Sequence, residues 1–163
     1  MPNKAPSILL GALVSLVLGV ILAFIAYSGS TAGMMLGGCG ACLAAFVGPG
    51  AAVWHYTNTH RLTLPVGSGA GLGAMTGMLG AVFSWAATFL LRSVGVFPTA
   101  EEWARRTQEA FGGSGADVPD MSGSFLSSPV GELLIGLVVG AIVGAIGGAV
   151  AASIFKKGTV GEV

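Results

Sequence analysis

Four long apolar segments, separated by more polar stretches, dominate the chain. They cover about residues 8–27, 33–54, 66–91 and 131–155, and no charged side chain lies deep inside any of them. At about 1.5 Å per residue, a helix of roughly 20 apolar residues crosses a bilayer core of about 30 Å. The pattern therefore predicts an all-α integral membrane protein, a four-helix bundle in which residues 1–163 form a single membrane domain.

The first segment has a competing interpretation as a cleavable signal peptide with Lys4 in its basic start. Its apolar run is longer than the roughly 7–15 residues of a signal-peptide core, which favours a retained helix. The short stretch of residues 28–32 then predicts that the first two helices form an antiparallel hairpin.

Glycines recur every four residues inside the apolar segments, and most clearly in the last one. This spacing leaves one stripe of a helix without side chains, so a second helix can approach closely along it. We therefore predict glycine-zipper packing. The packing residues that this pattern selects are Gly11, Gly19, Gly33, Gly37, Gly69, Gly73, Gly77, Gly136, Gly140, Gly144 and Gly148.

The one sizeable segment expected outside the membrane covers residues 93–130. Within it, TAEEWARRTQEAF predicts a short amphipathic helix, with Thr99 and Glu102 in the T-x-x-E pattern of a capping box. Opposite charges four residues apart, such as Arg105 and Glu109, support the polar face. Trp103 and Phe111 lie on the other face, where we expect them to rest on the bilayer or cover the bundle.

Composition agrees with a membrane location, because charged residues make up only 9% of the chain and mean hydropathy is +0.85. A net charge of zero offers no basic field for nucleic acid, so no such partner is expected. Lys4, Arg61, Lys156 and Lys157 fall on the side of both termini, which the positive-inside rule assigns to the cytoplasm. Trp54 suits the membrane–water interface, and Arg61 suits contact with lipid head groups or a partner.

Few residues are candidates for chemistry. Ion-coupled carriers place ionisable groups within the membrane, and these spans have none at depth. Cys39 and Cys42 form a C-x-x-C pair, which elsewhere supports thiol–disulfide exchange, although two inert packed cysteines explain it more simply. His55 and His60 share one predicted loop without a third metal ligand, and His55 is the one marginal haem ligand. We expect no metal and no cofactor.

Two resemblances follow from these features. The C-x-x-C near the start of the second helix and the long segment after the third resemble the layout of quinone-linked disulfide-generating membrane proteins. That resemblance implies redox chemistry at Cys39 and Cys42, but residues 93–130 lack the family's second cysteine pair. The glycine-rich stretch of residues 67–80, the acidic helix of residues 101–111 and Phe155-Lys156-Lys157 are similar to small uncharacterised four-helix bacterial inner-membrane proteins. This second resemblance implies a bacterial inner-membrane location and no particular activity.

The leading hypothesis is a non-enzymatic structural or accessory subunit that packs closely against other membrane subunits or against copies of itself. A channel or permease for a small neutral solute is the second hypothesis, and a thiol-disulfide oxidoreductase is the third. Besides these partners, the lipid bilayer itself is expected to contact most of the surface.

Overall fold

The structure is a computed structural model that describes residues 3–28, 30–111 and 128–156. Every regular element in these ranges is a helix of several turns. The helices are α1 (Ala5–Ala26), α2 (Thr31–His60), α3 (Val66–Ser93), α4 (Ala100–Phe111) and α5 (Pro129–Ile154). The all-α prediction is therefore confirmed for the described part of the chain.

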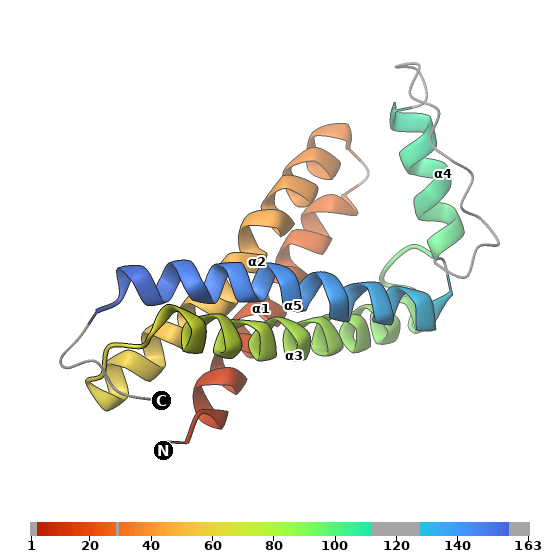
Figure 1. Ribbon diagram of the computed structural model, residues 1–163. Coiled ribbons are helices and arrows are strands. Elements are labelled where there is room, and N and C mark those ends of the chain that lie inside the picture. Colours follow the sequence, from red (N-terminus) through yellow and green to blue (C-terminus); the bar gives the residue numbers. More distant parts are fainter. Residues whose placement is uncertain (1–2, 29, 112–127, 157–163) are drawn as a thin grey trace.

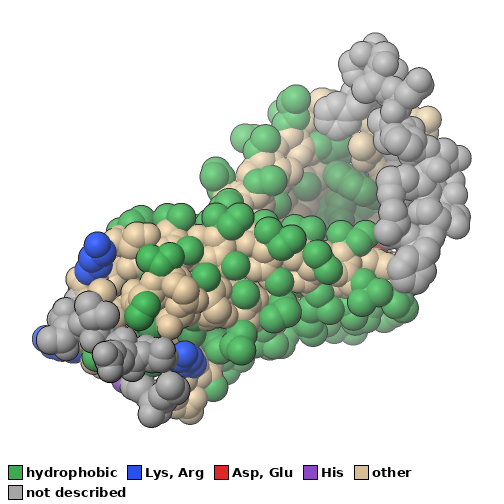
Figure 2. Space-filling model, viewed as in Figure 1, with side chains coloured by type: hydrophobic (Ala, Val, Ile, Leu, Met, Phe, Trp, Pro, Cys, Tyr) green, Lys and Arg blue, Asp and Glu red, His purple; other side chains and the backbone are tan. Residues whose placement is uncertain are grey.

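Four of these helices, α1, α2, α3 and α5, are long and apolar enough to cross a membrane. The chain is thus a multi-pass membrane protein by the length and composition of its helices. Large apolar side chains lie exposed along all four, among them Leu13, Leu43, Phe89 and Ile142. Figure 2 shows such side chains spread over the long body of the molecule, as expected of a surface that faces lipid.

The predicted end of the second helix, at about residue 54, is too early. The polar stretch after Trp54 was expected to form a loop, but α2 continues to His60. Tyr56 and Thr57 are fully buried there, and the Thr57 hydroxyl donates to the carbonyl of Trp54 at 3.0 Å. Tertiary contacts thus hold a segment whose composition favours a loop. The helix ends where Arg61 adopts a left-handed conformation with φ 52°.

The helices fall into two pairs that cross. Figure 1 shows α3 and α5 side by side along most of their length, while the α1–α2 hairpin crosses them and its tip points away. The first residues of α1 and the last of α5 lie at the same end of the molecule, which we call the inner end. The end that holds the hairpin tip and α4 is called the outer end.

The contact between α3 and α5 is made by backbone. A Cβ atom built at Gly140 would lie 2.7 Å from the carbonyl oxygen of Gly77, and one at Gly69 would lie 2.7 Å from that of Gly148. Between these, Gly73 faces the carbonyl oxygen of Gly144 even more closely. Since real Cβ atoms do not approach so near, no larger residue fits these positions without moving the helices apart.

The hairpin meets α3 through a second close approach. The Cβ position of Gly11 lies 2.5 Å from the carbonyl oxygen of Gly48 and 2.7 Å from the methyl group of Thr76. Thr76 is fully buried, and its hydroxyl donates to the carbonyl of Leu72 at 2.8 Å, so this buried hydroxyl is paired. Small residues therefore set the distance between α1, α2 and α3.

At the inner end the helices enclose a cluster of buried residues. Its members are Ala52, Val53, Tyr56, Leu64, Leu72, Ala151 and Ala152. They come from α2, α3, α5 and the α2–α3 connection, so this cluster holds three spans together where both pairs of helices meet.

A leucine at Gly73 is expected to lower the stability of the purified protein by about 1–3 kcal/mol, because it forces α3 and α5 apart. Gly71→Leu is the matched control, since a Cβ at Gly71 meets nothing within 4 Å. Unfolding in detergent, followed by loss of helical circular dichroism, measures both. Equal loss in the two variants would contradict the assigned faces of α3.

Candidate functional site

The outer end holds an open groove of about 220 Å³. It lies where the α1–α2 hairpin leaves the other two spans, and Figure 2 shows the corresponding hollow lined with hydrophobic side chains. Its lining is almost entirely apolar. The lining residues are Gly19, Leu22, Ala23, Ala26, Tyr27, Met34, Gly37, Gly38, Ala41 and Trp103.

The narrow tip of the hairpin follows from its local sequence. The Ser30 side chain caps α2 by accepting from the N–H of Gly33 at 3.0 Å. The Cβ position of Gly33 lies 2.6 Å from the carbonyl oxygen of Ile25, and that of Gly37 lies 2.5 Å from the Cβ of Ala26. Glycine at both positions therefore allows α1 and α2 to touch directly after the turn.

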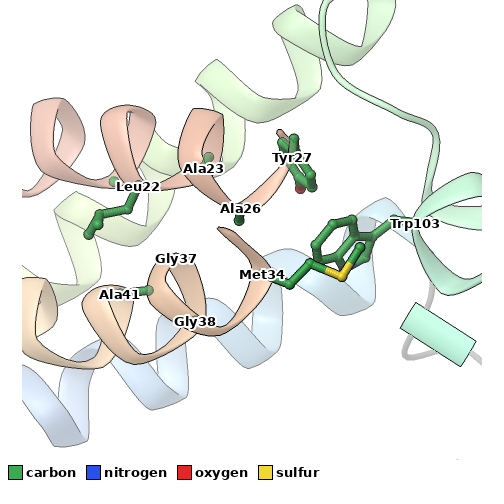
Figure 3. A pocket seen from close by; sticks show the side chains of 10 residues that line it. Leu22, Ala23, Ala26, Tyr27, Met34, Gly37, Gly38, Ala41 and Trp103 are labelled. Carbon is green, nitrogen blue, oxygen red and sulfur yellow. The ribbon is translucent and has the colours of Figure 1, made fainter. Parts of the chain in front are cut away.

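Three aromatic contacts attach α4 and the connection before it to the hairpin. The ring of Tyr27 lies 4.7 Å from that of Phe97 and 4.7 Å from that of Trp103, and the ring of Phe24 lies 4.9 Å from that of Phe97. Phe97 is 4% exposed. In Figure 3, Trp103 and Met34 lie next to each other at the mouth of the groove, with Tyr27 above them. Such edge-to-face pairs add stability beyond the area they bury.

The position of Phe97 depends on a glycine that ends α3. Gly95 has φ +75°, a conformation that residues with a Cβ seldom adopt. The N–H of Val96 donates to the carbonyl of Leu91 at 2.9 Å, and that of Gly95 to the carbonyl of Arg92 at 3.0 Å. This is the hydrogen-bond pattern of a Schellman motif, which turns the chain back toward the hairpin.

An ion pair joins the same ends of α3 and α5. Arg92 Nη1 lies 3.2 and 3.1 Å from the two carboxylate oxygens of Glu132. The indole N–H of Trp85 donates to the carbonyl of Pro129 at 2.9 Å, and Ser128 caps α5 by accepting from Gly131 N–H. Glu132 also suits the positive N-terminal end of α5. These bonds fix the first turn of α5 against the end of α3.

The amphipathic helix forms as predicted. The Thr99 N–H donates to the Glu102 carboxylate at 3.1 Å, and the Glu102 N–H donates to the Thr99 hydroxyl at 3.2 Å, which completes the capping box. Arg105 lies 3.8 Å from Glu109. Trp103 is half-buried, in agreement with its place on the apolar face. The side chain of Phe111 lies outside the described part of the structure.

The glycines selected from the sequence occupy several settings. Gly11, Gly37 and the glycines of the α3–α5 contact make close approaches to neighbouring helices, and Gly33 makes one within the hairpin turn. Gly19 and Gly136 make only ordinary contacts, at 3.5 Å from Ser84 Oγ and 3.7 Å from Ala81 Cβ. Gly48, which the spacing did not select, makes one of the closest approaches, at 2.7 Å from the carbonyl oxygen of Gly11.

The residues singled out for chemistry do not meet in one place. Cys39 and Cys42 are free thiols on the exposed surface of α2. His55 Nδ1 lies 2.9 Å from the Ser7 hydroxyl, and the ring of His60 lies 4.8 Å from that of Tyr56. Among the described residues, no three His, Cys, Asp or Glu side chains are arranged to hold a metal ion. Trp54 and Arg61 are both exposed toward the inner end of α2.

Sequence reasoning missed Tyr27, Phe97 and Gly95, which organise the outer end. The glycine shortly after Arg92 was a usable sign of a helix end followed by a reversal. The pairing of two aromatic residues 70 positions apart had no such sign. No known protein-family model, curated protein or solved structure matches this chain.

Replacing Trp103 by alanine is expected to release α4 from the hairpin, because its ring contact with Tyr27 is lost. Exchange of α4 amide hydrogens should become roughly three- to tenfold faster, the loss expected for one aromatic pair. Trp54→Ala serves as control, since Trp54 is 46% exposed. Unchanged exchange in Trp103→Ala would show that other contacts hold α4.

Proposed function

We propose that this protein is a non-enzymatic structural or accessory subunit of a larger membrane assembly, and that it acts by close helix packing. In this proposal α1, α2, α3 and α5 form a four-helix bundle, and the α3–α5 contact is its glycine zipper. The bilayer surrounds the bundle, and the partner is another membrane subunit or a second copy of the chain.

The observation that carries the proposal is a second set of glycines, which no described part of the chain covers. Cβ atoms built at Gly38 on α2 and at Gly67 and Gly71 on α3 meet nothing within 4 Å. All three residues are exposed. Gly67 and Gly71 are four residues apart, so they share one face of α3. This is a different face from that of Gly69, Gly73 and Gly77, which contacts α5. Bare backbone on a lipid-facing helix favours close approach of another helix.

The proposed location is the bacterial inner membrane, with both termini in the cytoplasm. The distribution of charge supports this orientation. Lys4, Arg61 and Lys156 lie at the inner end, whereas all carboxylates among the described residues belong to α4 or to the first turn of α5. Basic residues near the ends of spans favour the cytoplasmic side.

The test of the assembly is the native mass of the protein after gentle extraction from its own membranes, with co-purifying chains identified by mass spectrometry. We expect a complex larger than one chain. Gly67→Leu and Gly71→Leu should dissociate it and leave the single chain folded. A native mass equal to that of one chain, with no co-purifying subunit, would refute the proposal.

Fusions to the C-terminus test the orientation separately. A fluorescent protein that folds only in the cytoplasm should be bright, and alkaline phosphatase, which is active only outside, should be silent. The reverse pair of results would overturn the assigned orientation, while fusions within residues 112–127 should give the opposite signals to those at the C-terminus.

A further inference from the structure

A second groove lies between α2 and α5, close to the inner end. Its volume is about 390 Å³. Gly147 and Ala151 are buried and form its floor, and Gly50 leaves its α2 side open, because a Cβ there meets nothing within 4 Å. The complete lining is Phe46, Gly50, Gly147, Val150, Ala151, Ile154 and Phe155.

The groove faces the surrounding membrane. Val150 is 52% exposed and Ile154 is 67% exposed on its α5 side. No lining side chain carries a hydrogen-bonding group. Since both helices are membrane-spanning, water does not fill this space favourably, and hydrocarbon does.

The dimensions of the groove favour a hydrocarbon chain over a helix. Along α5 it extends from Gly147 to Phe155, about 12 Å at 1.5 Å per residue. The ring of Phe46 lies 3.2 Å from the Cβ position of Gly147, so it closes one end. A partner helix is about 10–12 Å wide with its side chains, so a narrower hydrocarbon chain fits better into a groove that is closed at one end.

Positive charge lies at the other end of the groove. The lining ends at Phe155, and the next residue, Lys156, is exposed. Arg61, at the end of α2, is exposed at the same end of the molecule, and no described carboxylate pairs with either residue. Figure 2 shows Lys and Arg side chains gathered at this end.

We propose that this groove binds one anionic phospholipid, with an acyl chain between α2 and α5 and the phosphate at Lys156 and Arg61. The apolar lining matches the acyl chain, and the two cations, which no described carboxylate pairs, match the head group. This site does not depend on the partner proposed above, because the open glycines of that proposal lie outside the groove lining.

The experiment is native mass spectrometry of the delipidated full-length protein in detergent, with dioleoylphosphatidylglycerol or dioleoylphosphatidylcholine added. We expect one tightly retained phosphatidylglycerol per chain and weaker retention of phosphatidylcholine. Lys156→Gln should weaken phosphatidylglycerol binding roughly fivefold, the effect of one basic residue near an anionic lipid. Arg106→Gln, the same change at the outer end, should leave binding unaltered.

A second variant tests the groove itself. Gly50→Leu places a side chain in the groove without meeting backbone, so the fold is retained while the retained lipid is lost. Ala32→Leu is its control, since Ala32 is exposed on α2 and lies outside the groove lining. Equal retention of both lipids by the wild type, or unchanged retention in Gly50→Leu, would overturn the proposal. Loss of a dimer in place of a lipid in Gly50→Leu would instead assign the groove to a second copy of the chain.

Discussion

The direct contact between the backbones of α3 and α5 is the constraint on which the rest of the structure depends. Three levels of glycine face glycine, from Gly69 opposite Gly148 to Gly77 opposite Gly140. In lipid there is little hydrophobic drive to bring helices together, so close van der Waals packing must supply the stability. That pair then offers a fixed surface, against which the inner half of the hairpin packs through Gly11, Gly48 and Thr76.

The two ends of the molecule are built by different means. At the inner end, α2, α3 and α5 share a compact buried cluster around Tyr56. At the outer end the hairpin separates from the other spans. There, contacts between aromatic rings and the Arg92–Glu132 ion pair hold the elements together. Small residues bring backbones together but leave grooves wherever two helices diverge. Both grooves described above lie at such places, which is why the lining of each includes glycine and alanine.

The spans and the capping box of α4 could be predicted because each depends on composition or on neighbours within four residues. The partners of the glycines could not. Every stripe has the same spacing, so nothing in the sequence says that Gly73 meets Gly144. Nor does it say that Gly48 approaches a neighbouring helix more closely than Gly19 does. The extension of α2 through Tyr56 and Thr57 was missed for a related reason, since burial against distant segments outweighs the polar composition of that stretch.

The pairing of α3 with α5 also dictates an order of biosynthesis. The hairpin partners are adjacent in sequence, so α1 and α2 can associate as soon as both have entered the membrane. The bare face of α3 is completed only after the intervening 35 residues between Ser93 and Pro129 have been synthesised and α5 has followed. During that interval α3 displays a strip of uncovered backbone to any neighbouring helix. Nascent chains arrested before α5 are therefore the species in which mispairing with other membrane proteins is most favoured, and in which an insertion chaperone has a surface to protect.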